Sequence, residues 1–422
     1  MKLRRELGFY VPAFFMLKVD TNESIHNVLN SAHERILSHE LIHFLQDLTT
    51  TYGLINISRC VDVVKDQNQI ALSGSRYLDV PIPISLYSPA VAANTDLFSC
   101  YIGDDASQYE EFPRSVSIVS VNEDLMDIDN VGCQIKVIEV EYGSPTFTYS
   151  KKFYFGAMAI CESMAHLIEC EIYGGESEIN NFPYNSATML TEFLCPHLKN
   201  NNQAVSEICE ASLMYYNPAE VFVMALNKIN EDKVVLDGSN DYYLYVVNNF
   251  TLESNSVEKE YNSIANSSIS QLNDLFTVEP LKSEQWASNL VVKARGLRNT
   301  NISITSRLWQ GDRDFKRASL MRIIRNIGFP VAFNNNDEVW NENSDKTLNT
   351  PLMFPAIMSV NEIFMAKRAQ CYLYEHCKKH GGYQVGDECM TNPWVRAKNG
   401  SVCYFSNMWK MWGLEKISIN IK

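Results

Sequence analysis

The amino-acid sequence predicts an α+β protein, and three observations support this fold class. Apolar residues recur at helical spacing between about residues 22 and 48. β-branched and aromatic residues then dominate from about 54 to 154, in short runs separated by Asp, Asn, Gly and Ser. Helical patterns follow from 156 onwards. We therefore expect a helix, a strand-rich segment, a second helix and a mostly helical C-terminal part.

The first helix has the clearest pattern. Thr21 or Asn22 can cap its N-terminus. We expect it to run to about Leu48, where the sequence Thr-Thr-Thr-Tyr-Gly closes it. Steps of four, three and four residues separate its apolar positions, which are Ile25, Leu29, Ala32 and Ile36.

The segment before this helix, residues 1–20, is interpreted as a first strand or sheet edge. Pro12 interrupts its apolar stretch, Lys18 and Asp20 follow closely, and no small-residue cleavage site appears, so it differs from a signal peptide. The eleven cysteines have no framework spacing and are interpreted as reduced thiols. Together these features predict a cytoplasmic protein.

The remaining elements are expected from residue type and periodicity. The runs expected to form strands are 55–64, 77–87, 115–121, 133–142 and 146–155. The second helix is expected over 156–172, before Gly174 and Gly175. Later helices are expected at 186–194, 204–216, 219–229, 268–276, 283–297, 315–327 and 361–379, with Asn- and Ser-rich loops near 199–203, 252–268 and 334–348.

Composition limits the partners. The 422 residues carry a net charge of −14, which argues against nucleic-acid phosphates and anionic membrane surfaces as main partners. No run approaches the roughly 18 uninterrupted apolar residues of a membrane span. We therefore expect neither a nucleic-acid nor a membrane partner, and the oligomeric state is left open.

The motif that indicates chemistry is His39-Glu40-Leu41-Ile42-His43. On a helix, positions four apart lie about 40° apart around the axis, so both imidazoles project from one face and can bind one zinc ion. Glu40 is rotated by about 100° from His39, which suits a base that contacts a water molecule rather than the metal. The histidines also continue the apolar stripe. The simpler alternative is a pair of core histidines bonded to carbonyls or carboxylates.

This motif and its apolar flanks resemble the active-site helix of the zincin metallopeptidases. A catalytic zinc needs a third protein ligand. The Gly and third His of the metzincin branch are absent, so the resemblance is to the gluzincin branch, which takes a Glu from a later helix. Glu162 is the best match, because it is a carboxylate in a helix of small and apolar residues. Glu169 is the alternative metal ligand. His166 stands where some gluzincins carry Asp, and it is a candidate for supporting a ligand or the bound water.

The resemblance implies a zincin-like catalytic core in residues 1–175, with the strand-rich segment between the two ligand helices. Residues 176–422 would complete the cleft or form a second, mainly helical domain. The implied function is that of a zinc-dependent metallopeptidase, with Zn²⁺ as cofactor, Glu40 as catalytic base and a peptide or protein as substrate. Two alternatives remain: a zinc-dependent hydrolase of a non-peptide acyl substrate, and a non-catalytic interaction protein built on the same scaffold.

A second group of metal-binding residue types lies near the C-terminus. It lacks a Cys-x-x-Cys pair, and lysines separate its two histidines, as at a basic helix C-terminus. Packed thiols and a helix end are the simpler interpretation, with a structural zinc as the alternative. Its members are Cys371, His376, Cys377, His380, Cys389 and Cys403.

Overall fold

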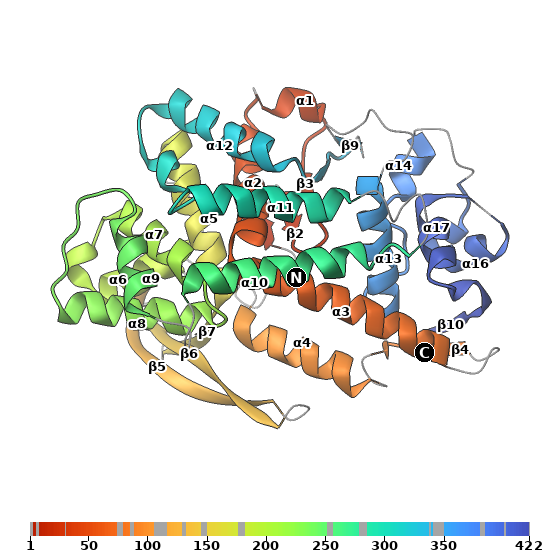
Figure 1. Cartoon of the computed structure of the whole chain (residues 1–422), viewed down its shortest axis with the longest axis horizontal. Coiled ribbons are helices and arrows are strands. Elements are labelled where there is room, and N and C mark those ends of the chain that lie inside the picture. Colours follow the sequence, from red (N-terminus) through yellow and green to blue (C-terminus); the bar gives the residue numbers. More distant parts are fainter. Residues whose placement is uncertain are drawn as a thin grey trace.

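The computed structural model confirms the mixed α+β class, because helices and strands are both spread along the chain (Figure 1). Helices predominate in the second half. The structure describes residues 3–5, 8–29, 31–73, 79–84, 88–104, 116–128, 132–144, 150–175, 182–250, 256–277, 285–336, 339–340, 350–379, 385–400 and 402–421.

The five-stranded sheet joins the N-terminal segment to residues 331–340. Its strand order is β1 (Leu3–Arg5), β2 (Gly8–Val11), β3 (Met16–Val19), β8 (Val331–Phe333) and β9 (Val339–Trp340). The first three strands pair antiparallel, and β3 pairs in parallel with β8, more than three hundred residues along the chain. The expected N-terminal strand is thus part of a three-strand meander.

Strands of the predicted strand-rich segment take part in two further sheets. The strands β5 (Ser117–Ile128), β6 (Cys133–Gly143) and β7 (Lys151–Phe155) form an antiparallel sheet. The short strand β4 (Asp79–Ile82) pairs in parallel with β10 (Ser418–Ile421). Four of the five predicted strand runs are therefore confirmed, at least in part. In Figure 1 the β5–β6 ribbon runs along the lower edge of the molecule, and its strands contact α4, α6 and α8.

The helices have the following bounds: α1 (Ile25–Val28), α2 (Glu34–Thr49), α3 (Thr51–Ser73), α4 (Pro89–Ile102), α5 (Ala157–Tyr173), α6 (Ser186–Leu194), α7 (Asn202–Ser212), α8 (Pro218–Glu231), α9 (Asp241–Asn249), α10 (Val257–Asn273), α11 (Trp286–Thr300), α12 (Arg313–Ile327), α13 (Met353–Phe364), α14 (Tyr374–Lys379), α15 (Glu388–Thr391), α16 (Pro393–Lys398) and α17 (Tyr404–Met411). None of these described helices has the length and apolar character required to cross a bilayer.

The strand prediction for 55–64 is wrong, because these residues belong to helix α3. Their β-branched composition hides a helical stripe. The buried apolar residues of α3 recur every three or four positions, and this face packs against α2 and α10. They include Leu54, Ile57, Val61 and Val64. Helix α4 also falls in the predicted strand-rich segment, where Ser88 caps it and Pro89 occupies its first turn.

The continuous helix predicted from residue 22 to 48 is also wrong in its first half. Helix α1 ends at Val28, and α2 begins only at Glu34. Between them the Ser31 hydroxyl accepts a hydrogen bond from the backbone N–H of His33 at 3.1 Å, a local contact that competes with helix formation. Ala32, expected on the buried stripe, is exposed.

Two later boundaries also differ from the prediction. Most of the expected loop at 252–268 is helix α10, whose Ser256 cap accepts a hydrogen bond from the Lys259 N–H at 3.3 Å. The expected helix at 361–379 is divided into α13 and α14, and Ala366 between them has a φ of 54°.

Helix α2 lies at the centre of the molecule, in contact with β2, α3, α5 and α11 (Figure 1). At its C-terminus, Arg298 of α11 donates to the carbonyl of Thr49 at 2.7 and 2.9 Å. The same guanidinium lies 2.8 Å from Oε1 of Glu210 on α7, and both side chains are buried. This buried ion pair anchors the end of α2 to the helical part of the chain.

Candidate metal centre

Helix α2 presents His39 and His43 on the face that packs against helix α5. Its start is stabilised by Glu34, an acidic residue in the first turn whose carboxylate pairs with Arg317 at 2.7 and 2.8 Å. Nearly all of α2 after this turn is buried. The histidines therefore project into the protein interior, where polar side chains need partners.

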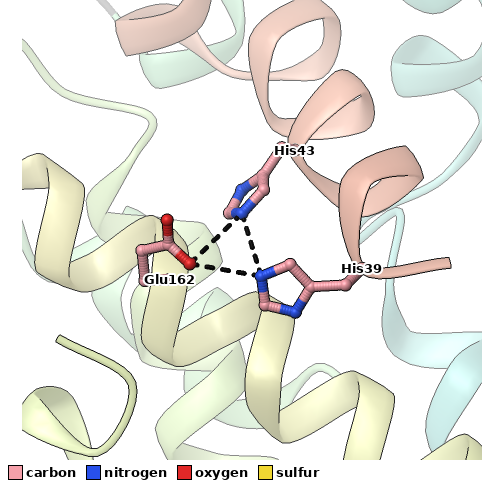
Figure 2. Close-up of side chains that lie close together, drawn as sticks. All are labelled: His39, His43 and Glu162. Atoms are coloured by element: carbon pink, nitrogen blue, oxygen red, sulfur yellow. Dashed lines mark hydrogen bonds and ion pairs between the residues drawn. The ribbon is translucent and has the colours of Figure 1, made fainter. Parts of the chain in front are cut away.

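Glu162 faces the two histidines from helix α5 (Figure 2). Its Oε2 lies 3.2 Å from Nε2 of His39 and 3.4 Å from Nε2 of His43, and the two Nε2 atoms are 3.1 Å apart. No side chain of this triad exposes more than 2% of its surface. Three ligand atoms from two helices thus form one small triangle in the interior.

The size of this triangle fits a metal ion of zinc's dimensions. Ligand atoms about 2.0–2.1 Å from a tetrahedral zinc lie about 3.3–3.4 Å from one another. The three observed separations, 3.1, 3.2 and 3.4 Å, are close to that spacing. Two nitrogens and one carboxylate oxygen are also a ligand set that zinc takes in catalytic sites. The residues present therefore fit the ion that the motif implies.

The outer ring nitrogen of each histidine also has a polar partner. Nδ1 of His39 lies 2.8 Å from Oε2 of Glu169, and Nδ1 of His43 lies 2.8 Å from Oε1 of Gln46. Both partners are acceptors, so each Nδ1 carries a proton, and a neutral imidazole in this tautomer presents the lone pair of Nε2 to the triangle. This is the usual arrangement around metal-binding histidines.

These two partners are themselves held in place. The Gln46 amide nitrogen donates to the carbonyl oxygen of Cys161 on α5 at 2.9 Å. Glu169 forms an ion pair with the guanidinium of Arg35, on the first turn of α2. Both contacts join α2 to α5, so the same hydrogen bonds that orient the histidines also hold the two ligand helices together.

The charges of the site are strongly coupled. Burial lowers the pKa of His39, but its hydrogen bonds to Glu162 and Glu169 outweigh burial and raise the pKa to about 10. Burial raises the pKa of Glu162, but the attraction of His43 and the hydrogen bond with His39 outweigh it and lower the pKa to about 2. The site therefore favours a positive charge at its centre, which a proton on His39 or a metal ion can supply.

Glu40 lies outside the ligand triangle, on the side of α2 that faces strand β2. It is fully buried, and its Oε1 lies 3.1 Å from the position that a Cβ atom would occupy at Gly8. A side chain at Gly8 would also come within 2.8 Å of Ile36. The glycine thus leaves the space that Glu40 uses, and the carboxylate is offset from the histidines as the helix geometry predicts.

The other two predicted site residues, Glu169 and His166, lie outside the ligand triangle. Glu169 contacts the outer nitrogen of His39, so the geometry favours Glu162 as the third ligand. His166 is buried on α5, with its ring nitrogens 3.6 and 3.8 Å from the Cys170 sulfur and its ring centroid 5.9 Å from that of Tyr184. The Tyr184 ring also lies 6.1 Å from His39.

Sequence reasoning did not identify Arg35, Gln46 or Tyr184 as parts of the site. Gln46 follows His43 by three residues on the same helix, a spacing that places the two side chains side by side. That signal was available for Gln46. Arg35 and Tyr184 reach the site only through the packing of α2 against α5 and against the turn before α6, which no local pattern reveals.

The C-terminal group of predicted metal-binding residues lies on other elements. Cys377 and His376 are on α14, Cys389 is on α15, and Cys403 precedes α17. Cys371 is buried after α13. His380 lies outside the described residues.

Comparisons with known proteins do not add a relative: no family model, no curated protein and no solved structure matches this chain significantly. A metal site is therefore inferred from the residues of this chain alone.

Proposed function

We propose that this chain is a zinc-dependent metallopeptidase of gluzincin type, in which His39, His43 and Glu162 hold the ion and Glu40 is the catalytic base. The zincin-like core would comprise α2, α5 and the sheet that packs on α2 through β2. The substrate would be a peptide or protein.

The observation that carries the proposal is the ligand triangle. The two Nε2 atoms lie 3.1 Å apart, although each Nδ1 has an acceptor beside it. When both imidazoles are neutral in this tautomer, their Nε2 lone pairs face each other, which requires a proton or a metal cation between them. Glu162 adds a negative charge at the same point. A bound divalent cation satisfies all three groups at once.

The roles of the residues follow from their positions. A zinc ion held here would supply an acidified water molecule and a polarised substrate carbonyl. Glu40, offset from the ligands, would accept the proton of that water and deliver it to the leaving amine. Glu169 and Gln46 would keep the imidazoles in the tautomer that leaves Nε2 unprotonated. The low exposure of the ligands means that α2 and its neighbours must open for a substrate to enter.

The same burial supports a second candidate function. A metal ion enclosed between α2 and α5 could be purely structural, in a non-catalytic interaction protein. Glu40 distinguishes the two cases, because a structural ion requires no neighbouring base. A third candidate, hydrolysis of a non-peptide acyl compound, uses the same residues and differs only in substrate.

The test combines metal analysis with turnover. His43→Ala should contain one zinc fewer per chain than the native protein and should lose hydrolysis of a quenched peptide library. His197→Ala, at an exposed histidine, is the matched control and should retain both. Equal zinc contents in native protein and His43→Ala would overturn the proposal. If the protein contains zinc but turns over only non-peptide ester or amide compounds, the non-peptide hydrolase is the correct candidate. If it contains zinc and shows no turnover, the ion has the structural role.

A further inference from the structure

The four C-terminal cysteines converge on one small cavity. Cys371, Cys377, Cys389 and Cys403 all line it, together with Arg396. The cavity encloses about 20 Å³, which is room for one water-sized particle. These thiols come from positions spread over 33 residues, so folding has gathered every cysteine of this region around one cavity.

Two of the thiols are positioned by well-packed helices. The hydroxyl of Ser359 on α13 accepts a hydrogen bond from the N–H of Tyr372 at 2.9 Å and lies 3.9 Å from the sulfur of Cys371. Cys403 is the N-cap of α17, where its sulfur accepts a hydrogen bond from the N–H of Ser406 at 3.4 Å. Helices α13 and α17 pack against each other. The packed helices α13 and α17 therefore hold Cys371 and Cys403 in position.

The other two thiols belong to a segment with little core of its own. Cys377 lies on α14 and Cys389 on α15, and neither of these short helices has a buried residue. The N–H of Cys371 donates to the carbonyl of Cys389 at 2.9 Å, which joins this segment to the chain that follows α13. Short elements without buried residues gain little from apolar burial, and a structural metal can take its place.

We propose that Cys371, Cys377, Cys389 and Cys403 bind one structural zinc ion, separate from the His39 centre. Four sulfurs are a ligand set that zinc prefers in closed structural sites, and the cavity between them has the volume for one ion. Binding would convert four thiols to thiolates and release four protons, leaving a net charge of −2 that the neighbouring Arg396 partly offsets.

The thiols must close around the ion to bind it. Within the described part of the chain, the His39 cluster alone brings three such ligand atoms within 4.8 Å of one another. Sulfurs about 2.3 Å from a tetrahedral zinc would be about 3.8 Å apart. Rotation of the cysteine side chains and movement of α14 and α15 would have to bring the sulfurs to this spacing. The ion would then tie both short helices to α13 and α17.

The test separates this site from the His39 centre by the chemistry of the ligands. The double variant His39→Ala/His43→Ala lacks the first centre, so its remaining zinc should show only sulfur neighbours at about 2.3 Å in X-ray absorption. In the otherwise native chain, Cys377→Ser/Cys389→Ser should contain one zinc fewer. Cys133→Ser, at an exposed cysteine on β6, is the control and should contain as much zinc as the native chain.

A measurement on the native chain guards against variants that fail to fold. Four thiols should become reactive to a thiol reagent in step with the release of one zinc by a chelator. No sulfur-bound zinc in the native chain would overturn the proposal, as would a native mass lower by two hydrogens per cysteine pair, the signature of disulfides. Equal zinc in a folded Cys377→Ser/Cys389→Ser variant would overturn it as well.

Discussion

Nδ1 of His39 lies 2.8 Å from Oε2 of Glu169, and both side chains are buried. This contact fixes the orientation of the His39 ring, because the ring can donate to Glu169 only while Nε2 points at the ligand triangle. The other carboxylate oxygen pairs with Arg35. Glu169 thus links a surface cation to the candidate metal centre through one carboxylate and one imidazole.

Glu169→Gln should weaken zinc binding without abolishing it. The amide can still accept from Nδ1, but the negative charge that raises the basicity of His39 is lost, and such changes typically cost about 10–100-fold in metal affinity. Competition with a chelator of known affinity measures the change. Glu162→Gln should lose zinc from this centre altogether. Glu171→Gln, on the same helix but paired with Lys316, is the control. An unchanged affinity in Glu169→Gln would show that this contact does not support the metal.

Two substitutions of Gln46 separate its contact with His43 from its contact with the Cys161 carbonyl. Gln46→Glu keeps an acceptor for Nδ1 of His43 but cannot donate to the Cys161 carbonyl, so zinc affinity should persist while the free energy of unfolding falls. Gln46→Leu loses both contacts and should lower both quantities. An unsatisfied buried group costs about 1–3 kcal/mol. Denaturant unfolding and zinc titration of the two variants check this. Equal zinc affinities in both would contradict the role assigned to Gln46.

Gly8 provides a test of the position of Glu40. Gly8→Ala would place a methyl group 2.8 Å from Ile36, 3.0 Å from the carbonyl oxygen of Lys18 and 3.1 Å from Oε1 of Glu40, so these neighbours must shift. Zinc content should be unchanged, whereas hydrolysis should fall, by up to about 100-fold for a displacement of about 1 Å. Gly296→Ala is the control, because nothing lies within 4 Å of its added Cβ. Full activity in Gly8→Ala would indicate that Glu40 does not need this space.

The candidate ligands could be found from the sequence because each is a polar residue in an apolar helix. His39 and His43 interrupt an apolar helix face, and Glu162 is a carboxylate in an apolar helix, so each demands a partner. Their supporting partners could not be found in this way. Glu169 was identified only as an alternative ligand, and its contact with His39 depends on the angle at which α5 crosses α2.

The fold class and some of the helices and strands could be predicted from the sequence. The strands β5 to β7 alternate apolar and polar residues or carry aromatic residues, and this pattern was sufficient to predict them. In α3, Ile57, Val61 and Val64 have high strand propensity but helical spacing, and packing against α10 decided the outcome. The pairing of β3 with β8 is a contact between distant segments, for which a single sequence carries no signal.

The buried pair of Glu210 and Arg298 predicts a pH dependence of stability. Burial raises the pKa of Glu210, but Arg298 and the hydrogen bonds from Ser303 and Thr305 outweigh it and hold the pKa below the ordinary 4.5. A carboxyl with a lowered folded-state pKa stabilises the fold above pH 4.5, and this stability is lost as pH falls from 4.5 through the folded-state value.

Glu210→Gln should remove this contribution. The free energy of unfolding at neutral pH should fall by about 3–5 kcal/mol, because Arg298 is left as a buried charge without its partner. Below pH 4.5 the slope of the unfolding free energy against pH should also fall, by the contribution of one titrating carboxyl group. Denaturant titrations over the acid range measure both effects. An unchanged slope in the variant would mean that Glu210 is not the group that titrates.

The measurement that tests the central claim most directly is made on Glu40→Gln: zinc bound per chain and turnover on a quenched peptide library, beside the native protein. The variant should retain the native zinc content, because Glu40 lies outside the ligand triangle of His39, His43 and Glu162. Its turnover should fall by at least the roughly 10²–10⁴-fold that a general base contributes, since the amide cannot accept a proton. Native turnover in Glu40→Gln would contradict the proposed mechanism, and loss of zinc from that variant would show that Glu40 is itself a ligand.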